Sequence, residues 1–179
     1  MVMKKYSFFI YSITSLHFVM TVESSKDYGS FSVHVNHLEL CKGPKRRDCS
    51  DIKAKMLNDV DLSYDIVIKE DVIPTRGKIF ASLNGKNVIR FQMKKPCDHL
   101  FIKPLFQAIL NVTDNCVFRK GNHHLQLNLD TVAQKYYGGM FLYGNMTFKS
   151  VFYNDACNLS CTIVQVELLP KTNTTLTKN

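Results

Sequence analysis

Tryptophan is absent from this 179-residue chain, and glycine (8) and proline (5) are scarce. So little glycine and proline excludes a collagen-like or low-complexity chain. Hydrophobic residues make up 45% and charged residues 21%, which excludes a disordered chain because there is enough apolar side chain to bury. The length suits one ordinary domain. We therefore expect a single folded domain with a substantial hydrophobic core.

The sequence also lacks the short motifs of common catalytic sites. It has no nucleophile elbow, no phosphate loop with Gly-Lys-Ser/Thr and no His-Glu-x-x-His pair. His123 and His124 are adjacent, so on a strand their side chains diverge, and neither has an oriented carboxylate or serine partner in the sequence. We predict a surface or strand-edge role for both, no enzymatic activity and no cofactor.

A zinc site could be imagined from His34, His37, Cys41 and Cys49. Histidines three residues apart on a strand point to opposite faces, however. Cysteines of an exported chain are also more often paired than metal-bound. We therefore predict no metal site.

Long apolar runs are absent except near the N-terminus. Lys4 and Lys5 precede an apolar stretch over 6–20, and small or polar residues follow over 21–25, as in a secretory signal peptide. A membrane-spanning helix needs about 20 apolar residues, and this run is shorter and interrupted by polar side chains. We predict a signal peptide over 1–24, cleaved after Ser24, and a secreted, extracellular mature chain.

Two further features favour export. The cysteine count is even and all six lie beyond the signal peptide, which suits three disulfides in an oxidising compartment. The six are Cys41, Cys49, Cys97, Cys116, Cys157 and Cys161. Four N-glycosylation sequons begin at Asn111, Asn145, Asn158 and Asn173. Asn158 lies between two cysteines, where a disulfide framework could block glycan transfer.

The dominant hydrophobic period is two, which predicts β-strands. The alternating or aromatic-rich segments are 31–40, 52–57, 60–68, 79–83, 88–93, 125–129, 140–143, 146–153 and 162–168. Asn84-Gly85 lies between two of them and is a strong hairpin signal. About eight short strands separated by turn signals predict an all-β, antiparallel β-sandwich.

One segment departs from this period. Asp98 can cap a short helix whose apolar residues recur at helical spacing, at 101, 105 and 109 and at 106 and 110. Pro104 suits its first turn or splits it. The Lys-, Thr- and Asn-rich tail over 171–179 is expected to be disordered, so we place the domain over 25–170.

The chain is basic, with 23 Lys and Arg against 15 Asp and Glu. Four of these cations, Lys42, Lys45, Arg46 and Arg47, lie in a loop between two cysteines. The loop is either a solvated segment or a surface that attracts an anionic membrane or a sulfated glycan. Nucleic acid is not an expected partner, because aromatic residues do not interleave with this run.

The order of residues in the C-terminal half carries a family resemblance. Cys97 precedes a short apolar insertion, followed by Cys116-Val-Phe-Arg-Lys-Gly121, a Leu-rich strand and Tyr143-Gly-Asn-Met-Thr-Phe-Lys149, and Cys161-Thr-Ile-Val-Gln-Val-Glu167 closes the series. This order resembles the MD-2-related lipid-recognition (ML) family, which includes the ganglioside activator protein, and is most similar to secreted insect members. Three residues depart from the family pattern: Val117 in place of proline, Met146 in place of an aromatic residue, and the additional Cys157.

The resemblance implies an immunoglobulin-like β-sandwich of about seven to nine strands that binds a lipid or other hydrophobic small molecule between its sheets. It also implies a disulfide between Cys97 and Cys116 at the base of the helical insertion. We further expect Cys161, at the start of the last strand, to pair with Cys41 or Cys49. A bridge between Cys157 and Cys161 is the alternative.

Phenylalanine is unusually frequent, and its rings either fill a plain core or line a cavity. We predict a cavity lined by Phe80, Phe91, Leu127 and Phe148, with the insertion as a lid that presents Phe101, Leu105, Phe106 and Ile109. The alternative is a satellite core without a cavity. The function would then be that of a secreted, glycosylated interaction protein that acts through its basic surface on a receptor or matrix.

Overall fold

The computed structural model describes residues 31–100, 102, 103, 106, 107, 112, 114–137 and 143–171. The expected signal peptide, residues 140–142 of the expected strand over 140–143 and residues 172–179 of the expected tail lie outside these residues. The strands are β1 (Phe31–Leu40), β2 (Ser50–Met56), β3 (Asp61–Ile68), β4 (Arg76–Leu83), β5 (Lys86–Lys94), β6 (Gly121–Asn128), β7 (Gly144–Tyr153) and β8 (Asn158–Pro170). The helices are the 3₁₀ turn η1 (Pro96–Asp98) and α2 (Leu129–Tyr137).

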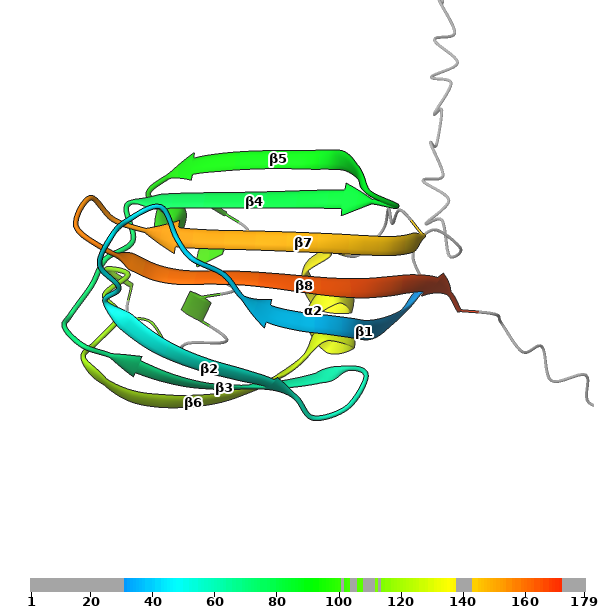
Figure 1. Cartoon of the computed structure of the whole chain (residues 1–179), viewed down its shortest axis with the longest axis horizontal. Coiled ribbons are helices and arrows are strands. Elements are labelled where there is room, and N and C mark those ends of the chain that lie inside the picture. The colour runs from blue at the N-terminus through cyan, green and yellow to red at the C-terminus, as the bar shows by residue number, and fades with distance from the viewer. Residues whose placement is uncertain are drawn as a thin grey trace, which may run out of the picture.

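The eight strands form two antiparallel sheets (Figure 1). Sheet A has the order β1-β8-β7-β4-β5 and sheet B the order β2-β3-β6. The two sheets face one another as separate layers, with their apolar side chains between them. The prediction of an immunoglobulin-like antiparallel β-sandwich is confirmed. No helix among the described residues has the length and apolar character needed to cross a membrane.

Most strand positions follow the alternation of the sequence. β1 has the predicted bounds, and β4 and β5 are joined through Asn84 and Gly85, both of which have positive φ (49° and 78°). Two consecutive residues in this conformation form the turn that suits the twist of a hairpin. Residues 102, 103, 106 and 107 of the predicted helical insertion are helical. The amides of Ile102 and Lys103 donate to the carbonyl of His99.

The helix α2 was not predicted, and it replaces the end of a predicted strand. Leu129 begins this helix instead of continuing β6. The side-chain Oδ1 of Asn128 accepts a hydrogen bond from the Thr131 amide (2.8 Å), which is the N-cap interaction of a helix. Asp130 in the first turn and Lys135 in the last have the charges that the helix dipole favours. A polar cap therefore ends the alternating pattern before Leu129.

The interior contains two hydrophobic clusters at opposite ends of the sandwich. The helix-end cluster lies at right in Figure 1, where α2 contributes Leu129 and Ala133. Its buried members are Phe31, Val33, Val35, Leu62, Ala81, Met146, Val166 and Leu168. The disulfide-end cluster has as its buried members Cys49, Ile68, Val72, Met93, Cys97, Ile102, Phe106, Val112, Cys116, Phe118, Phe152, Cys157 and Leu159.

The outer edge of β1 is covered by groups from outside sheet A. Three hydrogen bonds do this: Val33 N–H to Asp130 Oδ1 (3.3 Å), Gln134 Nε2 to Phe31 O (2.6 Å) and Val35 N–H to Asp59 O (2.5 Å). The first two come from α2 and the third from the β2–β3 loop. Backbone groups at a sheet edge that would otherwise be open to a further strand are thereby occupied.

Candidate functional site

A cavity of about 270 Å³ lies between the sheets within the disulfide-end cluster. Its lining is mostly apolar and comes from β2, β3, β6, β7, β8 and the segment before β6. The lining residues are Ile52, Ile66, Ile68, Phe106, Val112, Val117, Phe118, Arg119, His123, Phe152, Leu159 and Ser160. Both sheets therefore contribute walls.

Strand register explains why these side chains converge. Ile52 pairs with Ile66, and Ile66 pairs with His123, so one row crosses all three strands of sheet B. On sheet A, Phe152 pairs with Ser160. Partners in a ladder point to the same face, and both of these rows point between the sheets.

Aromatic rings form one wall of the cavity. Phe106, from the insertion between Cys97 and Cys116, contacts Phe118 and Phe152 edge-to-face, with ring centroids 5.4 and 4.9 Å apart. Such pairs add to the stability gained by burial alone. Phe118 is fixed in turn by two backbone hydrogen bonds with Val72. Phe106 of the insertion thus packs against β7 of sheet A and against the segment that precedes β6.

The polar residues of the lining are Arg119, His123 and Ser160. A ring nitrogen of His123 (Nε2) lies 2.9 Å from the carbonyl oxygen of Arg119. Arg119 Nη1 forms an ion pair with Asp71 at 2.5 Å, and the Lys120 amide donates to the same carboxylate (2.8 Å). The Lys120 amide first, and then Arg119, hold the pKa of Asp71 below its usual range.

Two disulfides frame the cavity end and a third ties two strands of sheet A. Cys97 pairs with Cys116 (Cα–Cα 5.9 Å) and Cys49 with Cys157 (5.6 Å). Cys41 pairs with Cys161 (4.9 Å), joining the end of β1 to β8. The Cys97–Cys116 pairing agrees with the family resemblance, and Cys161 takes Cys41 from the two expected partners. The alternative bridge between Cys157 and Cys161 is not formed.

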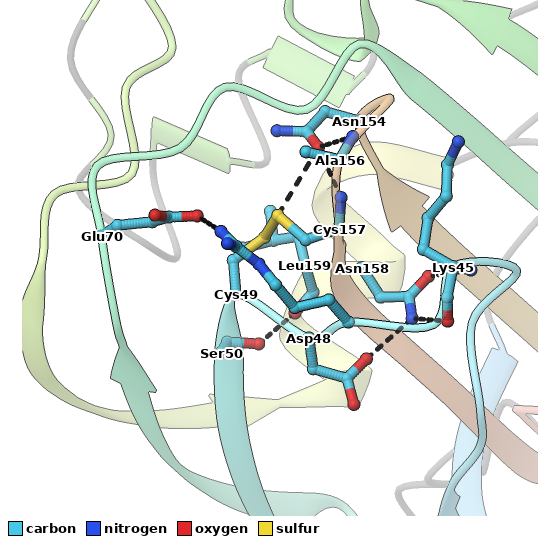
Figure 2. The surroundings of a disulfide bond; sticks show 11 residues. Lys45, Asp48, Cys49, Ser50, Glu70, Asn154, Ala156, Cys157, Asn158 and Leu159 are labelled. Atoms are coloured by element: carbon cyan, nitrogen blue, oxygen red, sulfur yellow. Dashed lines mark hydrogen bonds and ion pairs between the residues drawn. A yellow bond between two sulfur atoms is a disulfide. The ribbon is translucent and has the colours of Figure 1, made fainter.

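The side chain of Asn158 is part of the framework beside the Cys49–Cys157 bridge (Figure 2). The Asn158 residue is only 3% exposed. Its Nδ2 donates hydrogen bonds to the Lys45 carbonyl (2.9 Å) and to Asp48 Oδ1 (2.7 Å). Its Oδ1 accepts a hydrogen bond from the Lys45 amide (2.8 Å). An N-linked glycan attaches at Nδ2, so the folded chain has no room for one here. The burial of Asn158 agrees with the expectation that the disulfide framework could block glycan transfer at this sequon.

The other sequons differ in what the structure describes. Asn145 is exposed at the start of β7 and stays a candidate glycan site. Asn111 and Asn173 lie outside the described residues.

The residues considered for a zinc site do not gather. Cys41 and Cys49 are bonded to different partners. The argument that His34 and His37 diverge was wrong, because a β-bulge between Val35 and His37 puts both on the outer face of sheet A. His34 instead contacts Asp59 (3.1 Å), and His37 contacts Glu39 (3.3 Å).

One other group could suggest a metal. The Sγ atoms of Cys49 and Cys157 and a carboxylate oxygen of Glu70 lie within 4.8 Å of one another. The two sulfur atoms are bonded to each other, however, and so are not thiolate ligands (Figure 2). His123 and His124 do diverge: His123 lines the cavity and His124 contacts Asp65 outside it (2.7 Å).

The predicted cavity residues are dispersed. Phe106 lines the cavity. Phe91 packs against the disulfide-end cluster, whereas Leu127 and Phe148 pack against the helix-end cluster. Phe80 is a correction: it pairs with Arg90, next to the Ala81 that faces the core, and therefore lies on the outer face of sheet A. Phe101, Leu105 and Ile109 lie outside the described residues.

Sequence reasoning missed most of the cavity lining, above all the isoleucines Ile52, Ile66 and Ile68. The period-two pattern does identify Ile66 and Ile68 as members of one face. It carries no signal for which part of that face meets empty volume.

The basic loop between Cys41 and Cys49 is held in place. Its Lys45 backbone is hydrogen-bonded by Asn158, and Arg47 forms an ion pair with Glu70. Lys42 and Arg46 are exposed.

No family model matches the sequence, and no curated protein matches it. Among solved structures, chicken MD-1 complexed with lipid IVa is similar, with 14% sequence identity and a TM-score of 0.35. The match covers 76% of this chain and 97% of that chain.

Proposed function

We propose that this protein is a non-enzymatic carrier of a small hydrophobic molecule, which it holds between its sheets. The observation that carries the proposal is the apolar cavity, to which both sheets and the disulfide-closed insertion contribute walls. A cavity among apolar side chains stays dry and binds apolar molecules. The alternative function, an interaction protein with a filled core, is disfavoured because this core contains a cavity.

The volume limits the size of the ligand. A buried apolar cavity of about 150 Å³ accommodates benzene. In proportion, the 270 Å³ seen here accommodates about ten non-hydrogen atoms. This is one medium-length acyl chain or a compact terpene-like molecule, not a lipid with several acyl chains.

The energetics suit reversible binding. Each buried methylene contributes about 0.8 kcal/mol, so ten contribute roughly 8 kcal/mol before the costs of association. We infer that the head group contacts one or more of the polar lining residues Arg119, His123 and Ser160. No covalent step is needed.

The setting we propose is extracellular. The three disulfides support an oxidising compartment, in agreement with the expected signal peptide over 1–24. Membership of the lipid-recognition family is part of the same proposal and is supported by the sandwich and by the Cys97–Cys116 bridge.

The first test is binding. Protein from a secreting eukaryotic host is extracted with organic solvent, and the extract is examined by mass spectrometry for a stoichiometric apolar molecule. The emptied protein is then titrated with an environment-sensitive apolar dye, and linear fatty acids of increasing length compete for it. Competition should strengthen up to about ten carbons and then level off or weaken. Absence of both an extracted molecule and dye binding would contradict the proposal.

A pair of variants locates the binding site. Ile66→Phe adds volume at the cavity wall and should weaken dye binding by about tenfold. Leu127→Phe is the matched control, because it also lies on the inner face of sheet B but packs against the helix-end cluster. Equal loss in both variants would place the dye elsewhere. Thermal melts of both proteins show whether either substitution unfolds the chain.

A further inference from the structure

Three neighbouring strands of sheet A carry charge of one sign only. Every charged residue of β4, β5 and β7 is a cation, namely Arg76, Lys78, Lys86, Arg90, Lys94 and Lys149. Sheet B, by contrast, mixes Lys53 and Lys55 with three aspartates. The asymmetry lies in the strands themselves and not in a flexible loop.

Register gathers these cations, apart from Lys86 at the hairpin, on the outer face. Phe80 pairs with Arg90 on one side and Lys149 on the other, which makes one row across three strands. Arg76 pairs with Lys94 and with Tyr153, which makes a second row. The rows are four residues apart on β4, or about 13 Å. Ala81, of the opposite parity, is buried, so both rows face away from the core.

Two aromatic rings lie among the cations. The Arg90 guanidinium is 5.9 Å from the Phe80 ring centroid. The Nζ atoms of Lys78 and Lys45 are 5.7 and 5.9 Å from the Tyr153 centroid. Lys45 therefore joins this surface from the basic loop, because Asn158 fixes its backbone. We call the surface formed by Lys45, Arg76, Lys78, Arg90, Lys94, Lys149, Phe80 and Tyr153 the basic face.

The cations of the basic face are not paired with carboxylates in the described part of the chain. None of its six cations forms an ion pair there, whereas Arg47, Lys69 and Arg119 each pair with a carboxylate. Arg76 and Lys94 stand directly opposite each other, and like charges in that position destabilise a sheet. A bound polyanion would relieve this repulsion.

We propose that the basic face binds a sulfated polysaccharide chain. Two rows about 13 Å apart suit a linear polyanion that meets both rows, whereas a single small anion meets only one. A membrane is disfavoured, because peripheral binding to a bilayer buries apolar side chains in it. The exposed large aliphatic side chains of these strands, Val88 and Ile89, are confined to the hairpin half of β5. The inference is independent of the cavity.

The test uses heparin as the sulfated probe and two pairs of substitutions. Lys78→Gln with Arg90→Gln removes one cation from each aromatic ring. The matched control is Lys53→Gln with Lys55→Gln, which removes the same charge from exposed positions on sheet B. The first pair should weaken heparin binding at physiological salt by about tenfold and lower its salt dependence, and the control should change it less than about twofold. Thermal melts verify folding.

A second pair, Lys94→Gln with Lys149→Gln, repeats the test at other positions of the basic face and should weaken binding similarly. Equal loss in the sheet B control would mean that net charge alone attracts heparin and would overturn the proposal. So would loss of binding to phosphatidylserine vesicles in these variants with heparin binding unchanged, because the occupant would then be a membrane. Ile66→Phe should leave heparin binding unaltered, so failure of the cavity and failure of the basic face are distinguishable.

Discussion

The two ends of the sandwich close the space between the sheets by different means. At the helix end, α2 adds Leu129 and Ala133 to a cluster in which Phe31 and Leu62 are fully buried. At the disulfide end, Cys49–Cys157 and Cys97–Cys116 cross-link a cluster that retains a cavity of about 270 Å³. Packed side chains fill volume, whereas cross-links fix a frame and leave its interior open.

The free-energy cost of the cavity can be compared with the stabilisation that the two disulfides at that end provide. Enclosed apolar volume costs about 24 cal/mol per Å³, which sets an upper bound of about 6.5 kcal/mol for this cavity, since it is partly open to solvent. A disulfide stabilises by about 3 kcal/mol when it closes a short loop and by nearly 5 kcal/mol when it closes a loop of about 100 residues. Here the sequence separations are 19 and 108. The two cross-links thus offset the cost of the cavity.

The sharpest test of this comparison is a matched pair of truncations. Leu62→Ala at the filled end should cost about 4 kcal/mol, because every side of the residue loses contacts. Leu159→Ala at the cavity wall should cost about half as much, because that side chain already faces open volume. Urea unfolding measures both. Leu159→Ala should also shift the preferred fatty acid to a longer chain, and Leu62→Ala should not.

A second test uses alkaline pH to probe the filled end. Burial raises the pKa of Tyr64, which packs against the helix-end cluster, to about 12 from 10.0. The folded state then holds this proton more tightly than the unfolded state. Its stabilising effect is complete below pH 10 and is lost as the pH rises to 12.

Between these pH values the wild type should lose about 2–3 kcal/mol more stability than Tyr64→Phe, which has no proton to release. Urea unfolding at several alkaline pH values compares the two proteins. If the unfolding free energies of the two proteins fell in parallel with pH, water would reach the Tyr64 hydroxyl and the helix-end cluster would not be tightly packed.

The smallest effect is expected at the junction of α2 and β1. Asp130→Ala removes the acceptor for the Val33 amide and a favourable charge in the first helical turn, and should cost about 1 kcal/mol. Hydrogen exchange of the Val33 amide should become faster. Asp65→Ala, which removes only an exposed partner of His124, is the control and should have almost no effect.

Local patterns predicted most of the fold. Alternation in 31–40 predicted β1 with its observed bounds, and Asn84-Gly85 predicted the β4–β5 hairpin. The failures have local causes as well. The bulge between Val35 and His37 shifts the alternation by one residue, and the cap at Asn128 starts a helix within an apparently continuous strand pattern.

The site was less predictable than the fold. Alternation assigns Ile66 and Tyr64 to the same face, yet one lines the cavity and the other packs in the filled cluster. The difference arises from their neighbours. Ile66 shares the cavity with Phe152 and Ser160 of sheet A, whereas Tyr64 packs against the cluster to which α2 contributes. Such long-range neighbours follow from the closed sandwich and from the disulfides, and no short segment encodes them.

The covered edge of β1 has a consequence for assembly. Asp130, Gln134 and the Asp59 carbonyl occupy backbone groups of Phe31, Val33 and Val35, so a further strand cannot pair along the first half of β1 and sheet A extends more readily beyond β5. Fibre growth by edge-to-edge pairing of this sheet requires an unpaired strand at both edges of every molecule. With the first half of one edge occupied, backbone pairing of two β5 strands favours a closed pair over fibre growth through the larger sheet.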